Sequence, residues 1–318
     1  MKNVILFCLL LLSIVSKAQV IDNVSTFRND LRDKYVRWHY DNDYFTAKDE
    51  YYTQGITLEI VHPALKANPL NILLLKPKQS AYKYGLRFDS YGYTPTDIAA
   101  ETILYGDRPF SGNLSFSTFL MASDSVKNAR LSSTFTLGVI GSKAGGREIQ
   151  VKIHEWLKNI TPRGWKYQIA NDVIADYQVN YEKQLGRFRN IFLINSASEL
   201  RVGTHTNKIK TGFNFLLGHF NSPYQSNMPK KAGNFYFYGQ LQGGFTGYDA
   251  TLQGGFFNKN SPYTIAAKDI TRLTLQGDFG IVLNVKKIYL EYCQSFITKE
   301  FETQQFHRWG GVRIGVGF

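Results

Sequence analysis

The C-terminal end of this chain constrains its fold more than any other feature. Val312, Ile314, Val316 and Phe318 share one face of an extended segment, and Arg313 lies on the opposite face. Strands that alternate in this way over about ten residues, with one face in lipid and one in a lumen, build transmembrane β-barrels. The aromatic terminus behind such a strand therefore predicts a barrel of the outer membrane.

The N-terminus carries an export signal. Met1-Lys2-Asn3 precedes an apolar run at residues 4–15, and Ser16-Lys17-Ala18 follows it, which is the charged, apolar and small-residue order of a secretory signal. We expect residues 1–18 to be removed and residues 19–318 to form a single barrel domain. No later stretch approaches the roughly 20 apolar residues of a membrane helix, so strands must place the mature chain in the membrane.

Strand-period alternation recurs along the whole mature chain. It is clearest around Val36–Tyr40, Ile56–Ile60 and Tyr82–Phe88. Nine further candidates lie at 113–121, 131–140, 173–182, 190–202, 208–219, 234–246, 271–284, 287–297 and 308–318. A soluble β-sandwich could also alternate, but the signal and the terminal Phe favour an all-β, twelve-stranded antiparallel transmembrane β-barrel in the outer membrane of a Gram-negative bacterium.

One segment departs from the strand pattern. Between residues 147 and 160, Ile149, Ile153, Trp156, Leu157 and Ile160 recur at helical spacing, and Pro162 follows. This predicts a short loop helix that packs its apolar stripe on the barrel wall or in the membrane interface. His154 borders that stripe, where a packing role and a catalytic role are both open.

The net charge limits the kinds of binding partner that we expect, and the number of cysteines limits the disulfides that the mature chain can form. The net charge of +12 is scattered along the chain, which suits either an anionic lipid surface or an ordinary solvated one. An exported protein seldom meets nucleic acid, so we expect none as a partner. Cys8 lies in the signal, which leaves Cys293 alone and excludes an intramolecular disulfide.

Two polar segments could carry chemistry. The first, Asp41-Asn42-Asp43, is either a turn or a set of oxygen ligands suited to Ca²⁺. Since Asn42 and Asp43 would face opposite sides of a regular strand, their joint use requires a bulge or the end of the strand. The second segment holds Arg108, whose guanidinium could brace a turn or bind a carboxylate or phosphate.

Taken together, these motifs resemble those of a known family. In order along the chain they are Asn42-Asp43 with Phe45, Tyr-Tyr-Thr-Gln-Gly at 51–55, Tyr-Thr-Pro-Thr-Asp at 93–97, Asp-Arg-Pro-Phe-Ser-Gly at 107–112, the helix with His154, Gly164-Trp165, and Tyr-Asp-Ala-Thr-Leu at 248–252. The chain in this respect is similar to the outer-membrane lipid A 3'-O-deacylases, the LpxR family, over nearly all of its mature length.

The resemblance implies an active site near the outer rim, between the barrel wall and a helix. It implies Ca²⁺ as cofactor, lipopolysaccharide as substrate, and hydrolysis of the ester that holds the 3'-acyloxyacyl chain of lipid A. By motif, His154 matches the catalytic histidine, and Asn42 and Asp43 match the Asn-Asp pair beside the metal. Thr53 is the candidate for the family's hydroxyl residue.

The family also uses a lysine, for which Lys83 is the candidate, with Arg87 or Arg108 as substitutes. A basic residue there would bind a phosphate of the lipid A headgroup. In chemical terms, neutral His154 would deprotonate a water that attacks the ester, and Ca²⁺ would stabilise the oxyanion. We expect a monomer among outer-membrane lipids.

Two other functions remain open. The first is a channel or purely structural barrel, in which His154 only packs. The second is an outer-membrane phospholipase with a Ser-His-Asn arrangement, for which Ser111 and Asn113 are the nearest serine-asparagine pairing.

Overall fold

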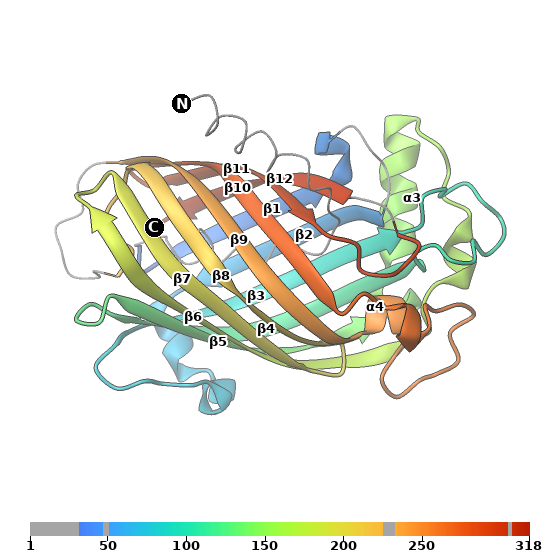
Figure 1. Cartoon of the computed structure of the whole chain (residues 1–318), viewed down its shortest axis with the longest axis horizontal. Coiled ribbons are helices and arrows are strands. Elements are labelled where there is room, and N and C mark those ends of the chain that lie inside the picture. Colours follow the sequence, from blue (N-terminus) through green and yellow to red (C-terminus); the bar gives the residue numbers. More distant parts are fainter. Residues whose placement is uncertain (1–31, 47–50, 225–232, 305–306) are drawn as a thin grey trace, which may run out of the picture.

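The computed structural model is a closed barrel of twelve antiparallel strands in sequence order, with β12 pairing back to β1 (Figure 1). It describes residues 32–46, 51–224, 233–304 and 307–318, so the predicted signal peptide lies outside the described residues. The strands are β1 Tyr35–Asn42, β2 Tyr51–Val61, β3 Ala81–Thr94, β4 Ser111–Asp124, β5 Ala129–Ile140, β6 Asp172–Phe188, β7 Phe192–Gly203, β8 Thr206–His219, β9 Asn234–Asp249, β10 Leu273–Val285, β11 Ile288–Ile297 and β12 His307–Gly317.

The prediction of twelve strands is confirmed, and the alternating apolar and polar residues face the outside and the lumen of the barrel as expected. On β1, Trp38 is exposed on the outer face, whereas Arg37 and His39 are buried toward the lumen. On β12, Ile314 and Val316 are exposed and Arg313 is buried. Among the described residues, no helix is both long and apolar enough to cross a membrane.

Buried ion pairs fill the lumen. Arg37 pairs with Glu59 across β1 and β2 at 3.0 Å, and Lys208 of β8 pairs with Glu199 of β7 at 3.3 Å. Further pairs join Arg130 to Glu182 and Arg313 to Glu291, with every one of these side chains less than a tenth exposed. Charges buried in a protein are tolerated when they are paired, and here their bulk occupies the space inside the wall.

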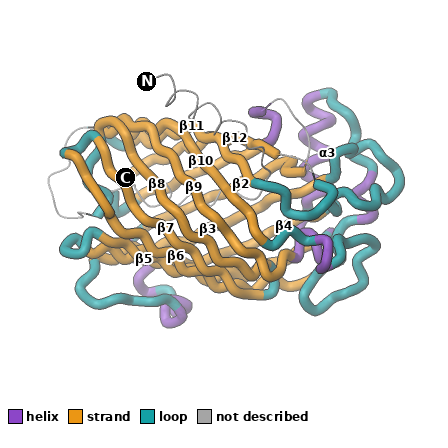
Figure 2. Tube along the Cα trace, in the orientation of Figure 1, coloured by secondary structure: helices purple, strands orange, loops and turns teal. Residues whose placement is uncertain are grey.

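The two ends of the barrel differ. Tight turns of four, three and two residues join β4 to β5, β6 to β7 and β10 to β11, at the end where β1 begins and β12 finishes. Outer-membrane barrels have short periplasmic turns and longer extracellular loops, so this end faces the periplasm. The long connections at 95–110, 141–171 and 250–272 gather at the other end, as Figure 2 shows.

Short helices lie in the connections. At the extracellular end are η2 Asp43–Thr46, η5 Ser142–Ala144, α3 Gly146–Leu157, η6 Gly164–Tyr167, α4 Ala250–Gln253 and η7 Ala267–Asp269. At the periplasmic end, η3 Pro63–Ala67 and η4 Pro69–Leu73 follow β2. The predicted loop helix is therefore present as α3, which stands at the rim of the barrel (Figure 1).

Candidate functional site

Two glycines seat helix α3 against the barrel rim. A Cβ on Gly146 would lie 2.9 Å from the ring of Trp165 and 3.0 Å from the Cα of Gly112, which belongs to β4. A Cβ on Gly112 would in turn lie 3.2 Å from the backbone of Gly146. Real Cβ atoms essentially never approach within 3.0 Å and rarely within 3.4 Å, so the absence of side chains at both positions lets the helix backbone touch the wall.

The face that α3 buries is polar. Gly146, Gln150 and His154, spaced four residues apart, are its buried positions, whereas Trp156 is 82% exposed and Leu157 is also exposed. The predicted apolar stripe is thus exposed at its C-terminal end, whereas Ile149 and Ile153 are only partly buried beside the polar face. A helix can turn polar groups inward here because Gln150 finds a partner in Thr53 of β2 and His154 finds one in the carbonyl of Ile160.

The helix ends three residues before the predicted boundary. Lys158 adopts a left-handed conformation with φ of 53°, and the amide of Asn159 donates to the carbonyl of His154 at 2.9 Å. This closes the helix C-terminus and turns Ile160 back over the last turn. As a consequence, the carbonyl of Ile160 contacts the side chain of His154.

The His154 ring is fixed by that contact. Its Nδ1 lies 2.7 Å from the carbonyl oxygen of Ile160. A carbonyl can only accept a hydrogen bond, so Nδ1 carries a proton, and in the neutral ring the lone pair is then on Nε2. The contact with Ile160 therefore favours, for a neutral His154, the tautomer that a general base at Nε2 requires.

The first strand ends at the residue pair that the sequence singles out. Asn42 is the last residue of β1, and Asp43 begins η2, so the pair sits at a strand end as its joint use requires. On β2 the pairing register shifts between Tyr52 and Gln54, which leaves Thr53 as the bulged residue. The Asn42 Nδ2 donates to the Thr53 carbonyl at 2.6 Å.

The orientation of the Asn42 amide follows from its partners. Because the Thr53 carbonyl is an acceptor only, the NH₂ group must point toward it, and the same nitrogen lies 3.1 Å from the hydroxyl of Tyr40. Both amide protons are thereby engaged. Asn42 can offer only its Oδ1 to a ligand.

A chain of three hydrogen bonding groups sets the direction of the Thr53 hydroxyl. The indole Nε1 of Trp165 donates to Oε1 of Gln150 at 2.6 Å, and Nε2 of Gln150 donates to Oγ1 of Thr53 at 2.7 Å. All three residues are buried. Since an indole N–H can only donate, the Gln150 amide has one possible orientation, and the Thr53 proton is left to be donated elsewhere.

His154, Asn42 and Thr53 all line one small cavity on the outer side of the wall. The cavity has a volume of about 110 Å³ and is lined by Tyr40, Asn42, Phe45, Thr53, Ile153, His154, Leu157 and Asn159. Tyr40 and Asn42 alternate with the lumen-facing residues of β1. The structure therefore brings His154, Asn42 and Thr53 together at the lipid-facing rim, between the wall and α3.

Asp43 stands next to this cavity and could complete an oxygen ligand set. Its side chain is buried, and it directly follows Asn42. One amide oxygen and one carboxylate are hard donors of the kind Ca²⁺ prefers, but Ca²⁺ takes six to eight oxygens. The pair therefore supplies two donors of the right kind, and a calcium ion held there would need further oxygen ligands from outside these two side chains.

The structure does not bring the predicted basic residues to the cavity. Lys83 lies near the periplasmic start of β3, where its Nζ donates to the Arg32 carbonyl at 2.6 Å. Arg87 is paired with the lumen-facing Glu59 in register and holds Asp89 at 2.8 Å. In both cases strand alternation directs the side chain into the lumen, away from the outer face.

Arg108 is also removed from the outer face. Its guanidinium is fully buried, pairs with Glu300 at 2.6 Å, donates to Thr251 Oγ1 at 2.9 Å, and lies 4.0 Å from the ring centre of Tyr93. This residue therefore braces the extracellular loops over the lumen and does not line the cavity that holds His154.

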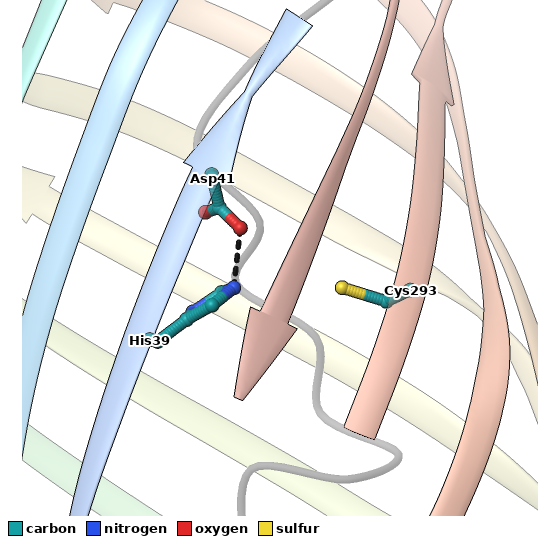
Figure 3. A group of neighbouring side chains, drawn as sticks. All are labelled: His39, Asp41 and Cys293. Carbon is teal, nitrogen blue, oxygen red and sulfur yellow. Dashed lines mark ion pairs between the residues drawn. The ribbon is translucent and has the colours of Figure 1, made fainter. Parts of the chain in front are cut away.

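A second cluster of ligand-type side chains lies on the lumen side of the same wall. His39, Asp41 and Cys293 place one donor atom each within 4.8 Å of one another, and His39 pairs with Asp41 (Figure 3). The Nε of Arg313 donates to Nδ1 of His39 at 3.1 Å. The Nε2 of a neutral His39 must then carry the proton, so this ring is committed to a hydrogen bond with Asp41 and has no lone pair for a metal.

Sequence reasoning missed Gln150 and treated Trp165 only as part of a motif. A signal for Gln150 is nevertheless present, because Gly146, Gln150 and His154 recur at intervals of four residues and so share one helix face. Analysis of the apolar stripe directed attention to the neighbouring face.

Comparisons with known proteins identify the family and the fold of the chain. The family model described as "Outer membrane protein LpxR" matches residues 4–318. Among solved structures, LpxR from Salmonella typhimurium aligns with a TM-score of 0.71 at 17% identity, over 89% of this chain and 100% of that one. The β domain of the Bordetella autotransporter BrkA aligns with a TM-score of only 0.47 at 9% identity, over 90% of this chain and 100% of that one.

No curated protein sequence matches the chain significantly. The Salmonella structure supports the fold, and the family model covers all of the strands and α3. The chain therefore belongs to the LpxR family of outer-membrane proteins.

Proposed function

We propose that this protein is a lipid A deacylase that hydrolyses, with Ca²⁺ as cofactor, the ester linking the 3'-acyloxyacyl chain to lipid A. The observation that carries the proposal is the cavity on the lipid-facing rim, which is shared by His154 with Nε2 free, the Asn42 amide oxygen and the Thr53 hydroxyl. Membership of the LpxR family and the resemblance to lipid A 3'-O-deacylases supply the substrate.

The reaction is a direct hydrolysis. Nε2 of His154 accepts a proton from a water molecule, whose oxygen forms a bond with the ester carbonyl carbon. The Thr53 hydroxyl donates to the carbonyl oxygen as negative charge develops on it. The bond to the sugar oxygen then breaks, that oxygen takes the proton back from His154, and the products are the free acyloxyacyl acid and the sugar hydroxyl.

Residues beside the cavity fit a role for calcium. Asn42 Oδ1 and the Asp43 carboxylate would hold the ion, which when bound supplies positive charge near the ester carbonyl. Asn42 itself cannot donate to an oxyanion, because both of its amide protons are used within the wall. Its proposed role is therefore that of an oxygen ligand.

The alternative of a channel finds no support in the lumen. The ion pairs of the described strands occupy the interior at several heights, and their side chains are less than a tenth exposed. A water-filled pore would expose such residues. A solid barrel agrees better with a scaffold whose chemistry lies on its outside.

The phospholipase alternative lacks the required geometry. Asn113 Nδ2 donates to Ser111 Oγ at 3.2 Å, and His205 Nε2 lies 3.0 Å from Asn113 Oδ1. The asparagine thus stands between the serine and the histidine, so the histidine cannot take the serine proton. All three side chains are buried and away from the lipid.

The test is release of acyl chains from purified lipid A by folded protein in the presence of Ca²⁺, followed by mass spectrometry. We expect loss of one acyloxyacyl group, and a decrease in rate of at least about a hundredfold in His154→Ala, consistent with loss of a general base. His219→Ala, at the exposed periplasmic end of β8, is the matched control and should act as wild type. Absence of any release by the wild-type protein would refute the proposal.

A further inference from the structure

A larger groove lies elsewhere on the outer wall. Its volume is about 900 Å³, and it runs over the extracellular halves of β8, β9 and β10. This volume falls in the range of roughly 300–1,000 Å³ typical of ligand sites. From β1 to β10 the barrel takes three strand steps, roughly 15 Å at the usual strand spacing, so the groove is separate from the cavity at His154.

A glycine makes the hollow. Gly243 lies opposite Leu275 of β10 and Thr211 of β8, and a Cβ built on it would meet nothing within 4 Å. Around this gap, the outward side chains of Ile209, Phe245 and Leu273 are each about half exposed or more. The floor and walls are therefore apolar, and the missing side chain leaves room between them.

The upper end of the groove is polar. Thr271, Thr298 and Lys299 belong to the loops above β10 and β11 and contribute to its lining. Lys299 is exposed, and no carboxylate of the described residues forms an ion pair with it. Thr298 Oγ1 accepts from the Leu275 amide at 2.8 Å, which leaves its proton available. The groove is therefore apolar below and polar at the rim, which fits an amphiphile with an anionic head at the rim and an acyl chain below it.

We propose that this groove binds a second molecule of lipid A, with one acyl chain beside Gly243 and a phosphate near Lys299. The extracellular position of the groove places it in the leaflet that carries lipopolysaccharide, and the cationic rim matches a phosphorylated headgroup. The inference rests on the outer-membrane orientation of the barrel and does not depend on the catalytic proposal.

The test compares lipid binding by the folded, full-length protein in native mass spectrometry. Gly243→Trp fills the hollow and should reduce the fraction of protein that carries a second lipid A by at least tenfold, whereas Leu241→Trp, on the same face of β9 but outside the groove, should not. Lys299→Glu should weaken retention severalfold, and Lys268→Glu, an exposed lysine of the neighbouring loop, should leave it unchanged.

Each contrary result has one meaning. An unchanged fraction with a second lipid A in Gly243→Trp, or no second lipid A on the wild-type protein, overturns the proposal. Equal retention of phosphatidylglycerol overturns the choice of lipid A. Deacylation of lipid A is measured in parallel, and Gly243→Trp should keep it, so loss of the groove and loss of the catalytic function are told apart.

Discussion

Changing Gln150 to glutamate tests whether the direction of the Thr53 hydroxyl matters. In the wild-type protein the Gln150 NH₂ donates to Thr53, so the Thr53 proton is available to the substrate. An ionised glutamate side chain at this position has no proton to donate. It would accept from both Trp165 and Thr53, and the Thr53 proton would turn away from the cavity while both buried hydrogen bonds persist.

The expected magnitude follows from the role of the hydroxyl. Loss of one oxyanion donor lowers kcat by roughly 10²–10³-fold, equivalent to about 2.7–4 kcal/mol. A protonated glutamate would still donate to Thr53 and preserve the wild-type pattern. We therefore expect the rate of Gln150→Glu, relative to wild type, to fall as the pH is raised and the carboxyl ionises.

The assay is the initial rate of acyl release from lipid A over a pH series, with the fraction of folded barrel measured for each variant. Thr53→Val should be about as slow as ionised Gln150→Glu. The double variant should be no slower than the slower single one, because both changes remove the same donor. Glu148→Gln, an exposed charge change on the same helix, is the control.

A wild-type rate for Gln150→Glu at every pH would refute this reasoning. Additive losses in the double variant would also contradict it, because they would show that Gln150 and Thr53 act separately.

Four further results are expected. Gly146→Val should lift α3 from the rim and lower activity at least tenfold in a barrel that still folds, as judged by gel mobility before and after heating. Arg108→Met leaves the buried Glu300 uncompensated and should cost about 3–5 kcal/mol of stability in chemical denaturation. Lys83→Ala should keep activity within about twofold in the acyl-release assay, since it lies at the periplasmic end; a large loss would show that the cavity is not the whole site. Chelation should abolish acyl release and added Ca²⁺ restore it, whereas Mg²⁺ should not, because Mg²⁺ demands a tighter octahedral shell.

The sequence alone determined the barrel. Alternation with a period of two fixes which side chains face the lumen, and closure satisfies the backbone of every strand in lipid. Strand number, orientation of Trp38 and Ile314, and the position of the loop helix follow from this local rule. Boundaries were less well predicted where a special conformation ends an element, as at Lys158.

The arrangement of the cavity depended on tertiary structure. Thr53 faces His154 because a bulge interrupts β2, and α3 reaches the wall because glycines meet at positions 112 and 146. Neither contact is encoded by a periodic pattern.

The predicted basic residues lie away from the cavity for a related reason. The side chains of Lys83 and Arg87 point into the lumen because of strand alternation, whereas Arg108 lies over the lumen because it pairs with Glu300. A sequence identifies which residues could do chemistry, but hydrogen bonding partners decide which atom of each is available. For His154 and Asn42, those partners come from segments six and eleven residues away that only the folded chain brings together.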